Sequence, residues 1–236
     1  MFNYIPNAYR KILFPPLHIR FLLLFGILLL VLIGIVNLGM IGSTLGKIGL
    51  SPINILMVMF LSFIFSPVNI PLYSIRTKRY IITTDYISFF GILYPIPKFE
   101  EIEDRTLVMV NVGGALIPLS FSIYLLMKNP IFITHAIIAI LIVSLITKIA
   151  AKPIKGVGIA TPAIIPPLAA ASIANILSPN FPYIVAYVSG TIGTLIGADI
   201  LNLHKVPKLG ASVVSIGGAG AFDGIFLSGL LALILS

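Results

Sequence analysis

The chain contains no cysteine and only three histidines among its 236 residues. Without cysteine it can form no disulfide framework, no thiolate metal site and no cysteine nucleophile. Three scattered histidines also argue against a histidine-rich metal site. We therefore expect the protein to use neither a metal nor another cofactor.

Charged residues are equally scarce, at 9% of the chain against 58% hydrophobic residues. This composition lies beyond that of ordinary globular domains and is typical of membrane proteins. A membrane helix needs about 20 apolar residues, and uncharged runs of that length occupy residues 21–46, 48–75, 106–127 and 129–147. A run over residues 156–198 is long enough to cross twice, and a last run extends from residue 211 to the C-terminus. The pattern predicts an all-α polytopic membrane protein of about seven helices, forming a single domain over residues 1–236.

The basic residues are distributed unevenly over the predicted loops. Counting alternate loops, 13 Lys and Arg residues fall on the side of the N-terminus and two on the other side. This asymmetry predicts a multi-pass protein of the cell membrane with its N-terminus in the cytoplasm and its C-terminus outside. The net charge of +8 then indicates contact with anionic lipid headgroups rather than nucleic acid.

The largest segment outside the predicted spans covers residues 74–105. Residues 79–83 and 86–90 are rich in β-branched and aromatic side chains, and Thr84-Asp85 separates them. This pattern predicts a β-hairpin with its turn at Thr84-Asp85. About 30 residues cannot hold a core alone, so we expect a cytoplasmic cap that packs on the helix ends.

Proline, glycine and asparagine interrupt several of the predicted spans. The interruptions lie at Asn69-Ile70-Pro71, at Asn111 followed by Gly113-Gly114 and Pro118, and at Pro166-Pro167. Backbone groups freed at membrane depth must face protein or a water-filled cavity. We therefore expect a central cavity that binds substrate, with Asn69, Asn111, Pro166 and Pro167 in its wall.

Two acidic residues follow Asp104, namely Asp199 and Asp223, and both lie inside apolar runs. A carboxylate in hydrocarbon costs at least a few kcal/mol, so such residues usually line a cavity, pair with a partner or do chemistry. Asp199 is expected about one turn inside the cytoplasmic membrane face. Asp223 reaches the same depth if its helix begins after Gly217-Gly218-Ala219-Gly220, because glycines start a helix poorly.

The predicted pair of aspartates supports two functions. Neighbouring carboxylates share a proton and can activate water for amide hydrolysis, with Gly197, Gly217, Gly218 and Gly220 holding an extended substrate. The same acids could instead couple a proton or cation to transport in a secondary transporter. A structural membrane protein whose acids pair with lysine or backbone is the third reading. The similar depth of the two acids favours the hydrolase by a small margin.

Five sequence blocks are distinctive, namely residues 69–72, 111–118, 156–168, 197–201 and 215–226. Together they resemble a family of prokaryotic integral membrane proteins, domain of unknown function 1614. The resemblance implies a polytopic membrane protein and no particular activity. In addition, Ile196-Gly197-Ala198-Asp199 is similar to the Gly-x-Gly-Asp motif of presenilin-like and prepilin-peptidase-like aspartyl proteases. Here Ile196 replaces the first glycine, and Pro166-Pro167-Leu168 precedes both aspartates, whereas the Pro-Ala-Leu of presenilins follows them.

Overall fold

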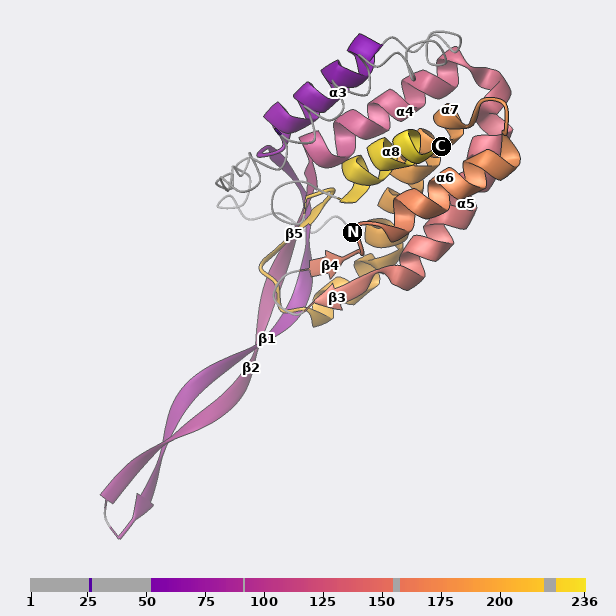
Figure 1. Ribbon diagram of the computed structural model, residues 1–236. Helices are drawn as coiled ribbons and strands as arrows, with labels where there is room; N and C mark the ends of the chain where they lie inside the picture. The colour runs from indigo at the N-terminus through magenta and orange to yellow at the C-terminus, as the bar shows by residue number, and fades with distance from the viewer. Residues whose placement is uncertain (1–25, 27–51, 91, 155–157, 219–223) are drawn as a thin grey trace.

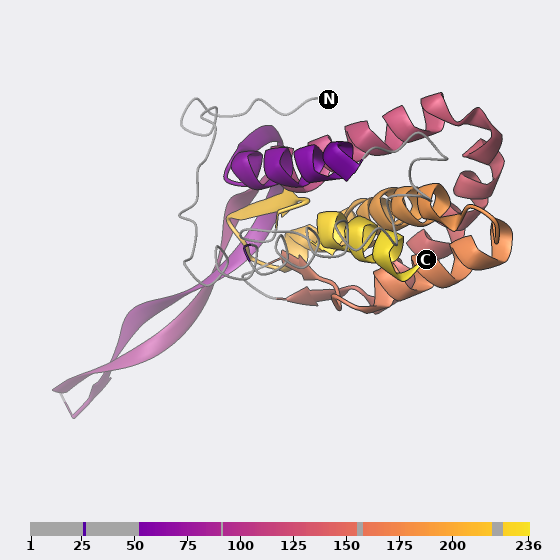
Figure 2. The same ribbon diagram turned by 45° about the horizontal axis from the view of Figure 1, so that its top comes forward.

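The computed structural model describes residue 26 and residues 52–90, 92–154, 158–218 and 224–236. This part of the chain forms a bundle of helices from which one long two-stranded ribbon projects (Figure 1). In a second view the ribbon again lies clear of the helices (Figure 2). The molecule therefore has two parts of different character, a packed bundle and an exposed ribbon.

The ribbon consists of strand β1 (Asn69–Phe89) and strand β2 (Ile92–Asn111). The strands pair antiparallel from their shared root, Asn69 opposite Asn111, to the tip, Phe89 opposite Ile92. At a rise of about 3.4 Å per residue, a strand of this length spans about 68 Å. Phe90 adopts a positive φ of 49° at the tip, as two-residue hairpin connections often require.

The sequence correctly indicates a hairpin in this segment, but the predicted turn at Thr84-Asp85 is wrong. Both residues lie within β1, where Thr84 is opposite Pro97 and Asp85 is opposite Ile96. The prediction relied on aspartate, which favours turns. The strand continues through this point because large apolar side chains pair across the ribbon on both sides of it. Ile82 is opposite Phe99, and Ile87 is opposite Tyr94.

A third strand joins the root of the ribbon. Strand β5 (Val213–Ile216) pairs in parallel with residues 107–110 of β2, which gives the strand order β1-β2-β5. Just before this pairing, the Thr106 hydroxyl donates to the Ala211 carbonyl at 2.6 Å. A second, small sheet consists of β3 (Lys152–Ile154) and β4 (Gly158–Ala160). The ribbon is thus anchored to a segment more than 100 residues away in the sequence.

Six α-helices occur in the described residues. They are α3 (Pro52–Phe65), α4 (Ile117–Lys128), α5 (Ile133–Ala150), α6 (Ile165–Leu177), α7 (Pro182–Val188) and α8 (Gly224–Leu235). Shorter helical segments are the π-helical turns Val112–Leu116, Ser189–Gly193 and Leu195–Asp199 and the 3-10 segments Pro130–Phe132 and Ile200–Lys208. Proline lies in the first turn of α4, α6 and α7, where its missing N–H leaves no hydrogen bond unmade. The predicted break at Pro166-Pro167 is therefore a helix start, whereas Pro118 comes just after the π turn Val112–Leu116.

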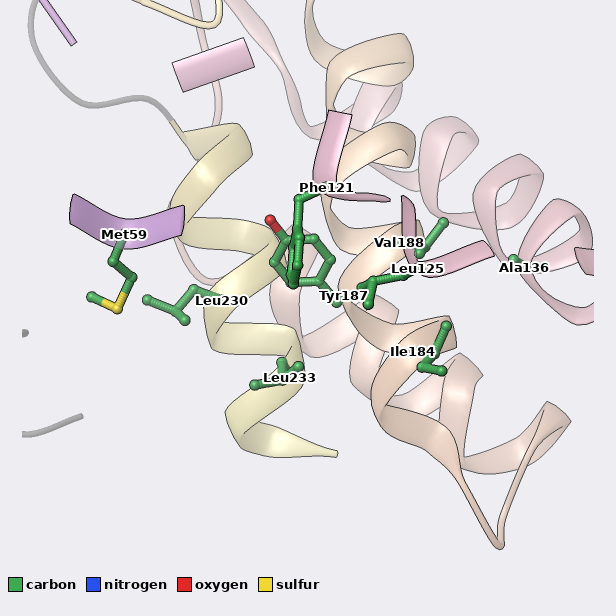
Figure 3. Packing of buried hydrophobic residues seen from close by; sticks show 9 residues of the cluster. All are labelled: Met59, Phe121, Leu125, Ala136, Ile184, Tyr187, Val188, Leu230 and Leu233. Atoms are coloured by element: carbon green, nitrogen blue, oxygen red, sulfur yellow. The ribbon is translucent and has the colours of Figure 1, made fainter. Parts of the chain in front are cut away.

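The main core surrounds α7, which packs against α4, α5, α6 and α8. Its buried side chains come from α3, α4, α5, α7 and α8, and Figure 3 shows how they lie. They are Met59, Phe121, Leu125, Ala136, Ile184, Tyr187, Val188, Leu230 and Leu233. The Phe121 and Tyr187 rings meet edge to face, with centroids 5.3 Å apart. This packing fixes the helix that carries Asp199 in the middle of the bundle.

The expectation of an all-α protein with seven membrane spans is wrong. Within the described residues, only Pro130–Ala150 and Pro182–Lys208 are long and apolar enough to cross a membrane. Two of the runs counted as spans, 48–75 and 106–127, contain the beginning of β1 and the end of β2. An apolar run rich in β-branched residues does not by itself distinguish a strand from a helix. The first predicted span, residues 21–46, lies outside the described residues except for residue 26.

The two long apolar helices are a weak indication of membrane association. They meet the test by length and composition alone, and the core helix of a soluble protein can meet it too. Of the two, Pro182–Lys208 is 72% buried within the protein, whereas Pro130–Ala150 is only 28% buried. Pro130–Ala150 therefore presents most of its apolar surface outward.

Candidate functional site

Asp199 lies on a helix of unusual geometry. The segment Pro182–Lys208 is 27 residues long and widens into π-helical turns at Ser189–Gly193 and Leu195–Asp199. It then tightens into the 3-10 segment Ile200–Lys208. Single π turns inside helices are uncommon and are found frequently at functional sites. Asp199 is the last residue of the second π turn, so the irregularity directly sets the position of its carboxylate.

Glycines allow this helix to approach its neighbours closely. A Cβ on Gly193 would lie 2.8 Å from Val143 Cγ1, and a Cβ on Gly197 would lie 2.9 Å from Ser144 Cα, both on α5. Small residues at such spacing permit close helix packing in apolar surroundings. Gly197, predicted as a substrate-binding residue, therefore occupies a helix–helix contact in this structure.

Asn202 stabilises the backbone just before Asp199. Its side-chain amide donates to the carbonyls of Gly197 at 2.9 Å and Ala198 at 3.0 Å, and the residue is fully buried. A change from π to 3-10 geometry disturbs the regular i to i−4 hydrogen bonds, and a side chain can satisfy the carbonyls concerned. Asn202 thus holds the turn that presents Asp199.

The Asp199 carboxylate reaches the loop after β5. Its Oδ2 accepts a hydrogen bond from the Gly217 backbone N–H at 2.9 Å, and Asp199 is half-buried. Gly217 has a φ of +73°, and a Cβ at this position would collide with Ala115. Glycine is required here for both reasons.

Asn69 and Asn111 join three segments at the root of the ribbon. The Asn111 side-chain amide donates to the Ser66 carbonyl at 2.6 Å and to Asn69 Oδ1 at 3.1 Å. Asn111 Oδ1 accepts from the Gly114 N–H at 2.6 Å, which caps the π turn Val112–Leu116. Asn69 Oδ1 also accepts from the Ser215 hydroxyl at 2.6 Å. The two asparagines therefore tie α3, the ribbon and β5 together.

Close backbone contacts connect this asparagine pair to Asp199. A Cβ on Gly114 would collide with the Gly217 carbonyl. A Cβ on Gly218 would lie 2.8 Å from Ser215 Oγ and 2.9 Å from Asn111 Cβ. Asp199, the glycine turn and the asparagines thus form one continuous polar cluster at the junction of bundle and ribbon. We refer to Asn69, Asn111, Asp199, Ser215, Gly217 and Gly218 as the junction cluster.

The predicted site residues do not all lie together in the structure. Five of them, Asn69, Asn111, Asp199, Gly217 and Gly218, come together in the junction cluster. Pro166 and Pro167 are buried in the first turn of α6 and take no part in the cluster contacts described above. Gly220 and Asp223 lie outside the described residues, so the pairing of Asp199 with Asp223 stays a prediction.

Sequence reasoning missed Ser215 and Gly114 as members of this environment. Ser215 lies in an apolar strand just before Gly217-Gly218. A polar residue at such a position is the sequence feature that could have indicated its part in the cluster. Gly114 was noted only as a helix breaker, although it supplies a backbone N–H to Asn111. Among the described residues, no group of three or more His, Asp or Glu side chains lies close enough to hold a metal ion.

Comparison with known proteins places this chain in a family. Residues 63–235 match the family described as "Protein of unknown function (DUF1614)", and since the match covers most of the chain, the protein belongs to it. No curated protein and no solved structure matches the chain. The family description names no activity, so the function has to be inferred from the junction cluster.

Proposed function

We propose that this DUF1614 protein is a membrane-embedded hydrolase in which Asp199 and Asp223 act as paired carboxylates on a peptide substrate. One observation carries the proposal: β5 ends at Ile216, and the next residue, Gly217, donates its backbone N–H to the Asp199 carboxylate at 2.9 Å. A sheet strand therefore leads directly to an acidic group within an apolar bundle.

Exposed apolar side chains support a location in the bilayer. On α5, Leu141, Leu145 and Ile149 are exposed to 60%, 58% and 84%, and α3 exposes Ile53, Met57 and Phe60 in the same way. Contiguous apolar surface of this kind marks contact with lipid or with another protein. We propose a multi-pass arrangement in the cell membrane, with the ribbon and the N-terminus on the cytoplasmic side, where basic residues contact anionic headgroups.

Two contacts of described residues support a short distance between the aspartates. Gly217, six residues before Asp223, donates to the Asp199 carboxylate. Ile225, two residues after Asp223, belongs to the same buried cluster as Leu195, one turn before Asp199. Both flanks of Asp223 are thus attached near the helix end that carries Asp199. Two carboxylates at close range share one proton.

The position of β5 suggests how an extended substrate binds. In the described sheet β5 is an outer strand, with β2 on one side. An extended peptide can add to such an edge through backbone hydrogen bonds. A peptide that continues along β5 passes Gly217 and brings one of its carbonyls beside the aspartates. The unwinding of a substrate helix at this edge would expose the amide bond to be cut.

The chemistry requires one protonated and one ionised carboxyl group. The ionised group takes a proton from water as the water oxygen attacks the amide carbon, and the protonated group donates to the carbonyl oxygen. The resulting tetrahedral intermediate loses its C–N bond as the nitrogen takes up a proton. The products are a carboxylic acid and an amine, and water is the only co-reactant.

The test uses the purified full-length chain in liposomes that contain a helical membrane peptide. We expect cleavage by the wild type and at least a 100-fold loss in both Asp199→Asn and Asp223→Asn, because each removes one of the two proton-transfer groups. Asp85→Asn is the matched control, since it neutralises an exposed carboxylate on the ribbon. Product masses locate the cut bond.

Equal cleavage by wild type and both site variants would contradict the proposal, since the activity would then come from elsewhere.

The second candidate is a proton- or cation-coupled transporter, and a row of buried hydroxyls favours it. The Thr194 hydroxyl donates to Ser228 Oγ at 3.0 Å, and Ser189 and Thr191 are buried on the same helix. Proton-dependent solute uptake into liposomes that Asp199→Asn abolishes, without peptide cleavage by the wild type, would establish this alternative.

A further inference from the structure

The ribbon ends in a long uncharged stretch. No charged residue occurs between Asp85 and Lys98, and we call residues 86–90 and 92–97 within this stretch the ribbon tip. Apart from Ser88, the ribbon tip consists of aliphatic, aromatic and proline side chains. It is also the part of the ribbon that lies farthest from the helices (Figure 1, Figure 2). The described helices therefore leave its side chains uncovered.

Both faces of the ribbon tip expose large apolar side chains. Antiparallel partners point to the same side of a ribbon, and successive pairs alternate between its two faces. The pair Ser88–Leu93 therefore lies on one face and the pair Phe89–Ile92 on the other. Leu93 is 64% exposed and Phe89 is 61% exposed. Phe90, beyond the last pair, is 91% exposed, and its ring meets that of Phe89 edge to face at 4.6 Å. A protein partner on one face would leave the other face in water, whereas lipid surrounds an inserted tip.

Prolines make the outer β2 edge of the ribbon tip unsuitable for an added strand. Pro95 and Pro97 lie two residues apart, opposite Tyr86 and Thr84, so their nitrogens point to the same edge. A paired strand accommodates proline with its nitrogen on the outer edge, because proline has no N–H to donate to the partner strand. The outer edge therefore lacks two donors that a further strand would need. For the same reason, fewer donors would be left without a hydrogen bond if this edge entered lipid.

Charged groups mark where the uncharged surface ends. Lys98 Nζ lies 3.2 Å from Glu100 Oε1 and 3.8 Å from Asp85 Oδ2. The hydrogen bond to Glu100 raises the pKa of Lys98 above its ordinary value, so the ammonium group stays charged. Tyr86 and Tyr94 lie between these charges and the end of the ribbon, and tyrosine rings are enriched at the boundary between lipid and water. Along the ribbon, phenylalanine is thus followed by tyrosine and then by ion pairs, which is the order of a change from hydrocarbon to water.

We propose that the ribbon tip inserts into the interfacial layer of a lipid bilayer. Insertion is shallow, because open sheet edges do not occur within the hydrocarbon region. A depth of about 5–10 Å corresponds to about two or three residues of each strand. The inserted side chains are then Phe89, Phe90, Ile92 and Leu93. Asp85 and Lys98 stay in water. This insertion does not depend on the proposed hydrolase activity.

Fluorescence quenching of a single label tests the insertion, because the sequence has no cysteine. The full-length variant Phe90→Cys is labelled with the fluorophore NBD and reconstituted into phosphatidylcholine liposomes, with or without nitroxide-labelled phosphatidylcholine. We expect the nitroxide lipid to quench the label, and iodide on both sides of the membrane to quench it little. Asp85→Cys is the matched control on the same strand. Its label should be quenched by iodide and not by the nitroxide lipid.

Two phenylalanine substitutions test whether the apolar end holds the tip in lipid. Phe89→Asp, added to labelled Phe90→Cys, places a carboxylate among the inserted side chains, where a charge is costly. Quenching by the nitroxide lipid should then be lost. Phe99→Asp is the matched control, since Phe99 is equally exposed at 69% but lies between Lys98 and Glu100, outside the ribbon tip. It should keep the quenching. Far-UV circular dichroism checks that both variants retain the helices.

Three outcomes would overturn the proposal. A label at position 90 that iodide quenches freely and the nitroxide lipid does not would place the ribbon tip in water. Protection of this label from both quenchers would place the tip against protein, either a second copy or another partner. Equal lipid quenching in Phe89→Asp and Phe99→Asp would show that the apolar end does not hold the tip at the bilayer.

Discussion

Replacement of Asn111 by alanine is the most direct test of the junction cluster as a structural unit. The side chain is 3% exposed and makes three hydrogen bonds, to the Ser66 carbonyl, to Asn69 Oδ1 and from the Gly114 N–H. A buried hydrogen bond contributes roughly 1 kcal/mol net, so the loss of all three should destabilise the protein by about 3 kcal/mol. This is a large effect for one polar residue, because most single substitutions cost less.

The measurement is reversible unfolding in mixed dodecyl maltoside and SDS micelles, followed by far-UV circular dichroism. Asn129→Ala is the control, since that half-buried side chain makes one hydrogen bond, to the Leu125 carbonyl at 3.2 Å, and should cost about 1 kcal/mol or less. Hydrogen exchange at the Gly114 amide should also accelerate in Asn111→Ala. If Asn111→Ala and Asn129→Ala unfold with the same free energy, the cluster does not hold the ribbon to the bundle.

Two further substitutions test the glycines around Asp199. Gly217→Ala places a side chain at a φ of +73° and against Ala115, so we expect a loss of about 2 kcal/mol or more and displacement of the Gly217 N–H from Asp199. Unchanged amide resonances of Ile216 and Gly218 in the NMR spectrum of Gly217→Ala would contradict this. Gly197→Val forces a branched side chain against the Ser144 backbone and should lower the midpoint of thermal unfolding by several degrees. Gly210→Val is the control. A Cβ at this position would meet no atom within 4 Å, so the substitution adds backbone strain at a φ of +64° but no steric collision.

The polar breaks in the apolar runs located part of the candidate site, whereas hydrophobicity alone did not give the correct secondary structure. The breaks at Asn69 and Asn111 pointed to irregular backbone beside polar groups, and both residues lie in the junction cluster with Asp199. The same motifs were interpreted as interruptions of membrane helices, whereas they mark the change from helix to strand and back. Hydrophobicity reports that a segment is buried or faces lipid, but not whether it is a strand or a helix. This is why the predicted spans 48–75 and 106–127 are each part helix and part strand.

The role of Gly197 and the partners of Asp199 were beyond the sequence for a different reason. Gly197 beside Asp199 suggested a substrate site, but its close contact is with Ser144, some 50 residues earlier. The hydrogen bond between Gly217 and Asp199 likewise depends on a parallel pairing between β2 and β5 across four helices. Contacts that depend on tertiary topology leave no local pattern to read.

The long ribbon is attached to the bundle at one end only, through the junction cluster. Its strands are about 68 Å long, so a sideways movement of the tip by about 10 Å turns the root by only about 8°. Such a rotation would act on Asn69 and Asn111, which lie at this root. The hydrogen bonds between Asn111 and Asn69, between Ser215 and Asn69 and between Gly217 and Asp199 thus form a continuous connection from the root of the ribbon to the acidic group.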